Sequence, residues 1–446
     1  MSTTEKLDTH RKALTLNLDP LIFGSFAEIG AGQEVARWFL VVGAASGTVA
    51  KAISAYDKEV SDDLYGSGSR YVSRQRLEAM LDREWAQLLS QLDKTRGSQT
   101  RFFCFVDTIS ARNYAGTNEA HGWIGLRFQQ QPGGEPNDVV LHINLRDPTN
   151  ILQQEAVGVM GVNLIYTAFH QSQTKESLLD GIAQDVEKRI EIDFVDLSGH
   201  AFETWDQREL LVHLVRTGLA EAVCFPSSSA PLPPTEVLYK KPLVLAPGYF
   251  VHVDPVHGEI HTRMLASATR QLQRESAESK APKGFFCLTS APPNTNEPPP
   301  EPSDLLNRID ALRSRGGNVL LFREQELYTL ADFVNRYTKD AVRFVVGLSV
   351  IIRTFEDRYN KLDGSLLRAL SHLFAQNVRI YAYPMTTPDL QEMIQSISAT
   401  GWEWTETNGS VSARQLHPAS PAGHLYEYLL ASHFLIPIEE SLITLE

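Results

Sequence analysis

Short apolar segments alternate with amphipathic segments over most of the chain after residue 98. Residues 101–108, 190–197 and 240–246 have the length and apolar content of buried strands, whereas residues 208–222 and 304–317 have helical spacing. Alternating strands and helices are typical of layered sheets whose strands are mostly parallel. The sequence therefore predicts an α/β fold class with mostly parallel sheets in two Rossmann-like lobes.

The chain is expected to have four parts. Residues 1–98 carry mainly helical patterns, and we predict a helical N-terminal region there. Residues 281–303 are rich in proline, which cannot donate a ladder hydrogen bond or continue a helix, so we expect a surface crossing. The first α/β lobe is then residues 99–280, and the second lobe with a C-terminal extension is residues 304–446.

Three pairs of similar segments raise an internal duplication as one interpretation. The pairs begin at residues 161 and 347, 177 and 365, and 102 and 285, with offsets of 186, 188 and 183. Chance similarity between apolar elements is the other interpretation. If the duplication is real, two similar lobes face each other and the cleft between them is the expected ligand site.

Charge and composition exclude several classes of protein. The net charge is −13, from 41 basic and 54 acidic residues, and no basic run is present, so we expect no nucleic-acid partner. No apolar stretch of about 18 residues and no apolar leader occurs, so we expect no membrane and a cytoplasmic location. The three cysteines, Cys104, Cys224 and Cys287, form no disulfide or zinc pattern.

The segment 243–271 carries the first candidate site. A strand-like run is followed by a loop with Gly248 and histidines and then by a helical pattern, and a helix N-terminus can bind an anion. We predict a cofactor-binding site at Gly248, Phe250, His257 and His261. A metal site that also uses His252 and Asp254 is one alternative. A polar surface loop with a capped helix is the other.

Two further groups of residues are candidates. Asp107 ends an apolar strand and is followed by Arg112 and Asn113, and such strand ends often hold catalytic groups. We therefore predict Asp107, Arg112 and Asn113 as catalytic residues. Clustered carboxylates suit a hard cation, so Asp57, Asp62 and Asp63 are predicted to bind Mg²⁺, with a solvated helix cap as the alternative.

The glycine-rich stretch 26–39 is a weaker candidate. It places polar residues, among them Glu28 and Glu34, beside Gly30 and Gly32. It lacks the dinucleotide fingerprint, because no GxGxxG spacing is present. Close helix packing through small residues and a ligand loop both remain open for this stretch.

Two resemblances add expectations. The Gly248, Phe250, Pro255 and histidine pattern loosely resembles the phosphate-binding turn of nucleotidyltransferases, with a longer spacing to Pro255 and histidines four residues apart. Residues 23–66, 101–114 and 141–166 resemble a widespread bacterial family whose members carry two conflicting names, TonB-dependent receptor and nicotinamide mononucleotide adenylyltransferase. This resemblance implies a soluble bacterial protein and implies no catalytic residue.

The leading hypothesis combines these features. We expect a protein that binds a nucleotide or another small phosphorylated ligand between the lobes. Any chemistry is expected to be Mg²⁺-dependent phosphate-centred transfer, such as nucleotidyl transfer. The alternative is a non-catalytic scaffold or regulatory protein that assembles as a homo-oligomer through its helical region.

Overall fold

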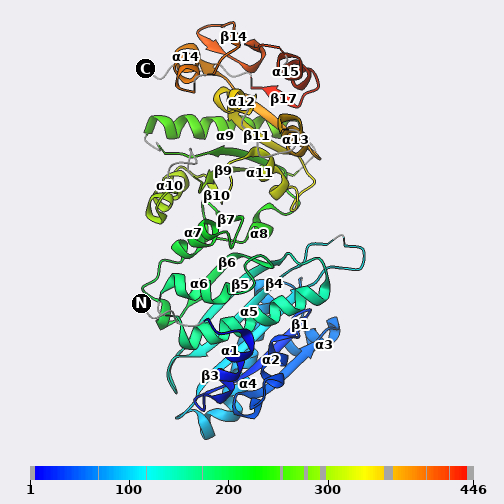
Figure 1. Ribbon diagram of the computed structural model, residues 1–446, viewed down its shortest axis with the longest axis vertical. Helices are drawn as coiled ribbons and strands as arrows, with labels where there is room; N and C mark the ends of the chain where they lie inside the picture. Colours follow the sequence, from blue (N-terminus) through cyan, green and yellow to red (C-terminus); the bar gives the residue numbers. More distant parts are fainter. Residues whose placement is uncertain are drawn as a thin grey trace. The chain divides into compact units, whose positions relative to one another are not determined.

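The computed structural model divides into two compact units, residues 1–221 and 222–446 (Figure 1). The structure describes residues 6–68, 70–116, 118–172, 174–251, 255–275, 280–291, 298–355, 365–397, 399–420 and 422–438. Each unit has its own sheet and its own helices. These sheets confirm the predicted α/β fold class with two lobes.

The first unit is built on a six-stranded mixed sheet in the order β2-β1-β3-β4-β5-β6. Its strands are β1 (Ile22–Gly30), β2 (Val49–Ala55), β3 (Arg101–Ser110), β4 (His121–Gln129), β5 (Pro136–Leu145) and β6 (Ile190–Ser198). Its helices are α1 (Thr9–Leu18), α2 (Val35–Val41), η1 (Ala45–Gly47), α3 (Lys58–Tyr65), α4 (Arg74–Arg96), α5 (Asn150–His170), α6 (Lys175–Ala183), η2 (His200–Phe202) and α7 (Gln207–Thr217). β2, β1 and β3 are parallel, and β3 to β6 are successively antiparallel.

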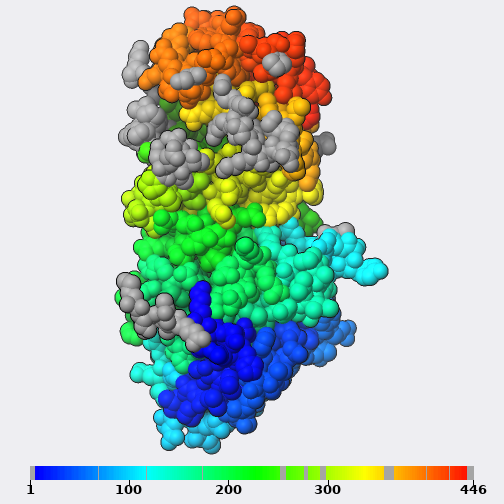
Figure 2. Space-filling view, in the orientation of Figure 1, coloured from blue at the N-terminus to red at the C-terminus, as the bar shows by residue number. Residues whose placement is uncertain are grey.

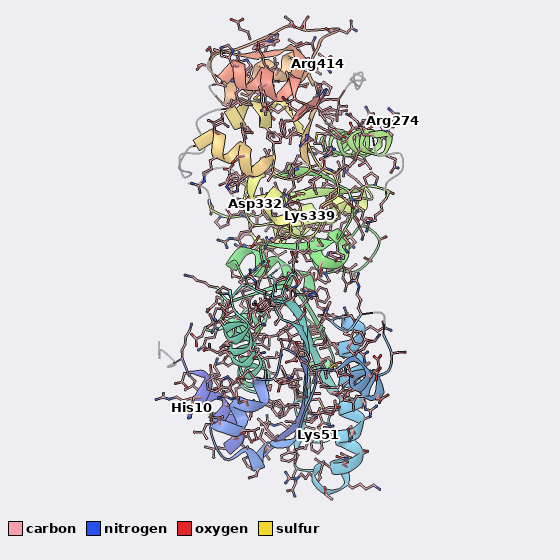
Figure 3. The ribbon with its side chains drawn as sticks, turned by 90° about the vertical axis from the view of Figure 1, so that its right-hand side faces the viewer. His10, Lys51, Arg274, Asp332, Lys339 and Arg414 are labelled. Carbon is pink, nitrogen blue, oxygen red and sulfur yellow. The ribbon has the colours of Figure 1, made fainter. Side chains whose placement is uncertain are left out.

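Helices cover both faces of this sheet. Figure 3 shows the sheet edge-on, with α1 and α5 on one face and α4 on the other. Helix α4 begins where the Ser73 side chain accepts a hydrogen bond from the Arg76 amide, and its apolar stripe is buried on the sheet. Helix α5 is buried around most of its circumference, because α1, α2 and α6 pack on it from outside.

The N-terminal residues differ from the helical region predicted over 1–98. They contain β1 and β2, both of which join the sheet of β3 to β6. β1 is buried on both faces, so its sequence lacks the alternation of apolar and polar residues that marks a half-exposed strand. The predicted helix after Gly32 ends early, because Gly43 and Ala44 adopt left-handed conformations with φ of 90° and 58°.

The second unit has a seven-stranded sheet in the order β17-β12-β11-β8-β9-β10-β7. Its strands are β7 (Ala222–Phe225), β8 (Leu243–Gly248), β9 (Lys283–Thr289), β10 (Asn318–Phe322), β11 (Val342–Gly347), β12 (Val378–Tyr383) and β17 (Leu435–Pro437). Its helices are α8 (Pro234–Leu238), α9 (Pro255–Glu275), α10 (Pro302–Ser314), α11 (Leu327–Val334), α12 (Leu348–Phe355), α13 (Ser365–Leu373), α14 (Thr387–Ser396) and α15 (Ala422–Ala431). Two small strand pairs and a short helix complete it: β13 (Met385–Thr386) with β15 (Ser410–Val411), β14 (Trp402–Trp404) with β16 (Leu416–Pro418), and η3 (Ala413–Gln415).

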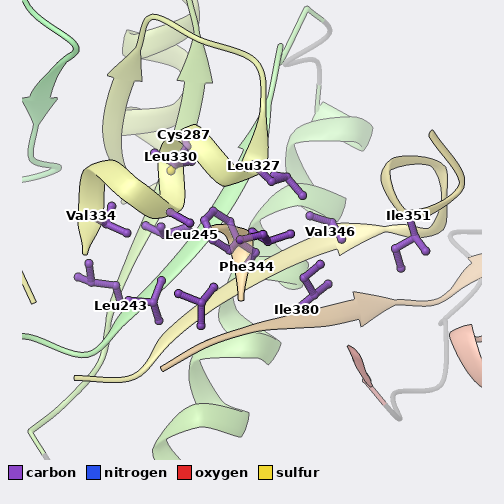
Figure 4. Packing of buried hydrophobic residues seen from close by; sticks show 14 of the residues in the cluster. Leu243, Leu245, Cys287, Leu327, Leu330, Val334, Phe344, Val346, Ile351 and Ile380 are labelled. Carbon is purple, nitrogen blue, oxygen red and sulfur yellow. The ribbon is translucent and has the colours of Figure 1, made fainter. Parts of the chain in front are cut away.

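The core of the second unit lies between its parallel strands and their helices. Figure 4 shows Leu245 of β8 and Phe344 of β11, which are paired in register, together with Leu327 and Leu330 of α11. All strands of this sheet run parallel except β7, which is antiparallel to β10. Parallel strands that are covered on both faces need apolar side chains on both faces. Their sequences are therefore apolar runs, which is why these strands could be predicted from the sequence.

The boundary between the units differs from the predicted one. It falls after Glu221, and the segment 281–303 that was predicted to cross between lobes contains β9, a strand of the second sheet. The two sheets also differ in strand order and direction, so the topology does not reflect the suggested duplication. For example, β3 has antiparallel β4 on one side, whereas β9 has parallel strands on both sides. Within the described ranges, no helix has the length and apolar character needed to span a membrane.

Candidate functional site

The strand order of the second unit creates a crevice at one edge of its sheet. From β8 the chain continues to β9 and β10 on one side, and β11, β12 and β17 then follow on the other side of β8. The loops that leave β8 and β11 therefore diverge at the carboxyl ends of these strands. In open α/β sheets with this order, ligands bind at such a switch point.

A pocket of about 140 Å³ lies at this switch point. It is lined by the turn after β8, the ends of β9 and β10, the start of α11, and α12. Its apolar lining includes Phe322 and Leu330. The polar side chains of the lining are Thr289, Glu324, Gln325, Glu326, Arg353 and Thr354.

Two loops of the pocket are joined by hydrogen bonds at the ends of β9 and β10. The Thr289 hydroxyl donates to the Glu324 carbonyl at 2.9 Å, and the Ala291 amide donates to the same hydroxyl at 3.2 Å. The Ser290 amide donates to the Phe322 carbonyl at 2.8 Å. Because Thr289 links both loops, its side chain positions the Glu324 backbone beside the pocket.

The turn after β8 is fixed by a charged residue of α10. The Arg308 guanidinium donates to the Tyr249 carbonyl at 2.9 Å, and an ion pair with Asp304 at 2.6 Å holds the guanidinium in place. A bond from a charged donor is about twice as strong as a neutral one. The pocket wall formed by Gly248 and Tyr249 is therefore preorganised.

The charged groups of the pocket have opposite signs. Arg353 projects from α12 and is exposed, and within the described part of the chain no side chain or carbonyl accepts a hydrogen bond from its guanidinium. Glu324 and Glu326 also line the pocket and form its acidic wall, and the Glu324 carboxylate is 3.6 Å from the Arg323 guanidinium. An arginine without an internal carboxylate partner can offer its planar donors to an anion.

The structure places the residues of the predicted cofactor site in different roles. Gly248 lines the pocket, and a Cβ at this position would come within 3.1 Å of the Phe250 ring. Phe250 is buried with a positive φ of 48°, and its ring packs edge-on against His261 and Phe286. Phe250 and His261 therefore contribute packing beneath the turn after β8, and the Phe250 side chain is buried. The side chain of His257, like residues 252–254, lies outside the described residues.

Asp107 lies in the first unit and is fully buried within β3. It faces Glu28 of β1 in parallel register, and Glu28 accepts hydrogen bonds from the Val35 and Ala36 amides at 2.9 and 3.1 Å. Neither oxygen of Asp107 has a hydrogen-bonding partner of ordinary geometry among the described residues. A Cβ at Gly32 would come within 2.0 Å of the Asp107 carboxylate, so only glycine fits above it.

The two carboxyl groups cannot both be ionised without cost. Burial raises the pKa of Glu28 to about 7, although the Val35 and Ala36 amides oppose the shift. Burial and the nearby Glu28 carboxylate raise the pKa of Asp107 well above its ordinary value, and the Ile29 amide opposes this only in part. Like charges in one buried site favour retention of a proton by the pair.

Arg112 and Asn113 are not brought to this carboxyl pair. They lie in the exposed loop after β3, which projects from the surface of the first unit (Figure 2). The Arg112 amide donates to the Gln153 side chain at 3.1 Å, and the Asn113 amide donates to the Asn118 side chain at 2.7 Å. Asp107 itself is inside the sheet, so the three residues predicted as catalytic do not form one site.

The carboxylates predicted to bind Mg²⁺ have other partners. Asp57 caps α3 by accepting from the Glu59 and Val60 amides. Asp62 pairs with Arg76 at 2.8 Å and accepts from the Tyr71 hydroxyl at 3.0 Å, while Asp63 is exposed. In the described ranges, no group of three or more His, Cys, Asp or Glu side chains is arranged to hold a metal ion.

Sequence reasoning missed the polar residues of the switch-point pocket. Thr289 and Glu324 follow the apolar runs of β9 and β10 closely, so their position after a parallel strand was the available signal. Arg353 lies within α12, and no local pattern shows that this helix faces the crevice.

Comparison with known proteins adds little to this geometry. No protein-family model and no curated protein matches the sequence. Solved structures match about a third of the chain. They include competence/damage inducible protein CihA from Agrobacterium tumefaciens, with 17% identity, a TM-score of 0.25, and coverage of 36% of this chain and 94% of that one. A competence-damaged protein (CinA) superfamily protein from Enterobacter cloacae has 12% identity, a TM-score of 0.27, and coverage of 38% and 96%. At these scores the likeness carries no argument about function.

Proposed function

We propose that the second unit binds a small phosphorylated metabolite, with nucleotides as the first candidates, in the switch-point pocket. The observation that carries the proposal is Arg353, an arginine without an internal acceptor among the described residues, beside the carboxyl ends of β8, β9 and β10. A guanidinium binds phosphate through two parallel hydrogen bonds, which fix orientation as well as supply charge.

The acidic wall supports a ligand that also carries hydroxyl groups. An ionised carboxylate accepts hydrogen bonds and donates none. Glu324 and Glu326 therefore favour a sugar hydroxyl, which can donate, over a second phosphate, which would repel them. The pocket of about 140 Å³ is partly apolar, with Phe322 and Leu330 in its lining. A nucleotide or a sugar phosphate has groups that suit each part of this lining, with the phosphate at Arg353 and the hydroxyls at the acidic wall.

The same carboxylates fit a role for Mg²⁺. This cation is usually held by one or two carboxylates together with substrate phosphates, and Glu324 and Glu326 are two carboxylates on one wall of the pocket. When bound, Mg²⁺ would neutralise phosphate charge and so favour phosphate-centred transfer. Arg353 would orient the phosphate, and Thr289 would hold the Glu324 loop in position.

Calorimetric titration of the full chain with ATP, ADP, AMP and ribose 5-phosphate, with and without Mg²⁺, tests the proposal. We expect saturable binding of at least one of these ligands, and an affinity at least about tenfold lower in Arg353→Ala, which corresponds to about 1.4 kcal/mol. Arg368→Ala is the matched control, because Arg368 is exposed on α13 of the same unit and outside the pocket lining.

Two results would contradict the proposal. One is equal affinity in Arg353→Ala and the unchanged protein. The other is no binding of any of the four ligands, and large assemblies by light scattering would then favour the scaffold interpretation.

A further inference from the structure

A cavity of about 220 Å³ lies in the first unit between the edge of its sheet and the second half of α4. Alternate residues of β1 and β2 form the floor of this cavity, because strand residues two apart point to the same face. They are Phe23, Ser25, Val49 and Lys51. Helix α4 packs on β1, β3 and β4, and β2 is the last strand of the sheet, so the space over β2 stays open beside the helix.

One side of α4 forms the wall of the cavity. Its lining residues are three to five positions apart or adjacent to such a position, as expected for one side of a helix. They are Glu84, Gln87, Leu88, Gln91, Leu92 and Arg96. Along the helix, the two leucines lie between Glu84 at one end and Arg96 at the other. The wall is therefore apolar in its middle and charged at both ends.

The charges at the Glu84 end cancel. Glu84 is buried, accepts a hydrogen bond from the Tyr65 hydroxyl at 2.9 Å, and forms an ion pair with Lys51, which lies on the α4 side of the sheet (Figure 3). Lys51 also donates to Gln87 Oε1 at 2.8 Å. A lysine only donates, so the Gln87 atom that faces it is the oxygen, and the Gln87 amide NH₂ is directed elsewhere.

The Arg96 end carries a positive charge that no carboxylate balances. The Arg96 guanidinium lies over the Phe23 ring, 4.1 Å from its centroid. A guanidinium that stacks on a ring keeps its N–H donors, which lie in its own plane, free to bind an anion. Within the described part of the chain, Arg96 forms no ion pair, and Asp93, three residues earlier, is exposed and outside the cavity lining. The lining as a whole therefore has one net positive charge.

The position of Arg96 favours a singly charged ligand. Arg96 lies in the last turn of α4, where the helix dipole is negative and disfavours added negative charge. A carboxylate therefore suits this place better than a doubly charged phosphate. Phe23 lies two residues, or about 7 Å, before Ser25, which is in register with Lys51. This separation leaves room for an apolar group about the size of one ring.

We propose that the first unit binds a small organic carboxylate in this cavity. The carboxylate lies at Arg96, and an apolar ring or branched chain packs against Val49, Leu88 and Leu92. This site is separate from the one proposed in the second unit and takes a ligand without phosphate, so either proposal can fail without the other.

Ligand-observed NMR titration of the full chain tests the class of ligand. Benzoate and isovalerate are the probes. Acetate lacks the apolar body, benzyl alcohol lacks the charge, and inorganic phosphate replaces the carboxylate; each is measured by its displacement of the bound probe. We expect at least one probe to bind with a Kd of about 1 mM or lower, and the other three compounds to bind at least about tenfold more weakly. No saturable binding of either probe, or equal affinity for acetate or phosphate, would overturn the proposal.

Variants test whether the probe binds in this cavity. Arg96→Gln removes the charge and should weaken binding of the probe at least about fivefold. Lys94→Gln is the matched control, because it removes the same charge from the same turn at an exposed residue outside the lining. Leu92→Trp should abolish binding by filling the cavity, and thermal unfolding shows whether this variant is folded. Equal weakening in the two charge variants, or full binding by a folded Leu92→Trp, would contradict the proposal.

Discussion

The two units place their ionisable side chains differently. In the described part of the first unit, seven Lys, Arg, Asp and Glu residues are buried: Lys12, Glu28, Arg76, Glu84, Asp107, Glu191 and Asp193. In the described part of the second unit, Arg343 alone is buried. The charged groups of the second unit's pocket lie in the segment after β10 and on α12, and among them Glu324 and Arg353 are exposed.

This difference follows from how the sheets are built. The doubly wound sheet of the second unit needs apolar side chains on both faces of its strands, and its loops are left to carry polar groups. The mixed sheet of the first unit instead holds paired polar groups inside, such as Glu84, which accepts from the Tyr65 hydroxyl and pairs with Lys51. We therefore expect the stability of the first unit to depend on pH and on single polar residues more than that of the second.

The largest expected effect comes from Lys12, which joins α1 to the rest of the first unit. Its ammonium group donates to Asn163 Oδ1 at 2.7 Å and to Gln184 Oε1 at 2.9 Å. Lys12→Met keeps the length but leaves two buried oxygens without this donor, and should lower the free energy of unfolding by about 3–4 kcal/mol. Urea unfolding followed by tryptophan fluorescence measures it, with Lys188→Met, at an exposed lysine, as the control. A loss below about 1 kcal/mol would mean that the buried charge is not needed.

The pH dependence of Glu28 gives the next largest effect. Its pKa rises from 4.5 in the unfolded chain to about 7 in the folded one, so the folded state binds more protons between these values. Stability from this group is present below pH 4.5 and is lost as the pH rises to about 7, by at most about 3 kcal/mol. The contribution of His121 to stability has the opposite pH dependence and is lost as the pH falls, because its pKa of about 4 in the folded state lies below its ordinary value.

The difference between the unchanged protein and Glu28→Gln isolates the Glu28 contribution. We expect the unchanged protein to lose stability relative to the variant as the pH is raised from 5 to 7. Glu187→Gln, at an exposed position, should show no such trend. A difference independent of pH would show that the carboxyl pair titrates as it does in water.

The same contrast explains what the sequence revealed. The apolar runs of β3, β8 and β11 identified strands, because each is buried on both faces. β1 was missed, since its run 22–30 includes one glycine inside the strand, another at its last residue, and a glutamate that tertiary contacts keep buried. The position of Asp107 in an apolar run marked it as unusual, but only the register with β1 shows that it faces Glu28.

The pocket of the second unit could be located from the sequence only in part. Gly248 was identified from its place between a strand and a helix, and it lines the pocket. Arg353 was not identified. Its position in the pocket lining depends on the connection from β10 to β11 on the other side of β8, which brings α12 to the switch point. Local patterns report which elements form, whereas strand order decides which of their side chains meet.

A smaller effect is expected at the strand ends of the second unit. Thr289→Val keeps the shape of the side chain but removes the hydroxyl that joins the Glu324 carbonyl to the Ala291 amide. We expect a loss of about 1 kcal/mol in stability and weaker ligand binding, because the Glu324 loop is released. Thermal unfolding and calorimetry measure the two effects, and Thr269→Val is the control, because the Thr269 hydroxyl donates to the Leu265 carbonyl within α9 and Thr269 does not line the pocket. Unchanged binding would mean that Thr289 does not position the pocket.

The smallest expected effect tests the carboxylates of the first unit that were predicted to bind Mg²⁺. Asp57 caps α3 through the Glu59 and Val60 amides, so Asp57→Ala should cost about 1 kcal/mol whether or not Mg²⁺ is present. Asp63→Ala should cost less than about 0.5 kcal/mol, because Asp63 is exposed. If Mg²⁺ instead stabilises the unchanged protein and this gain disappears in both variants, the carboxylates bind the metal, and the first unit would then share a ligand-binding surface of the kind assigned above to the second.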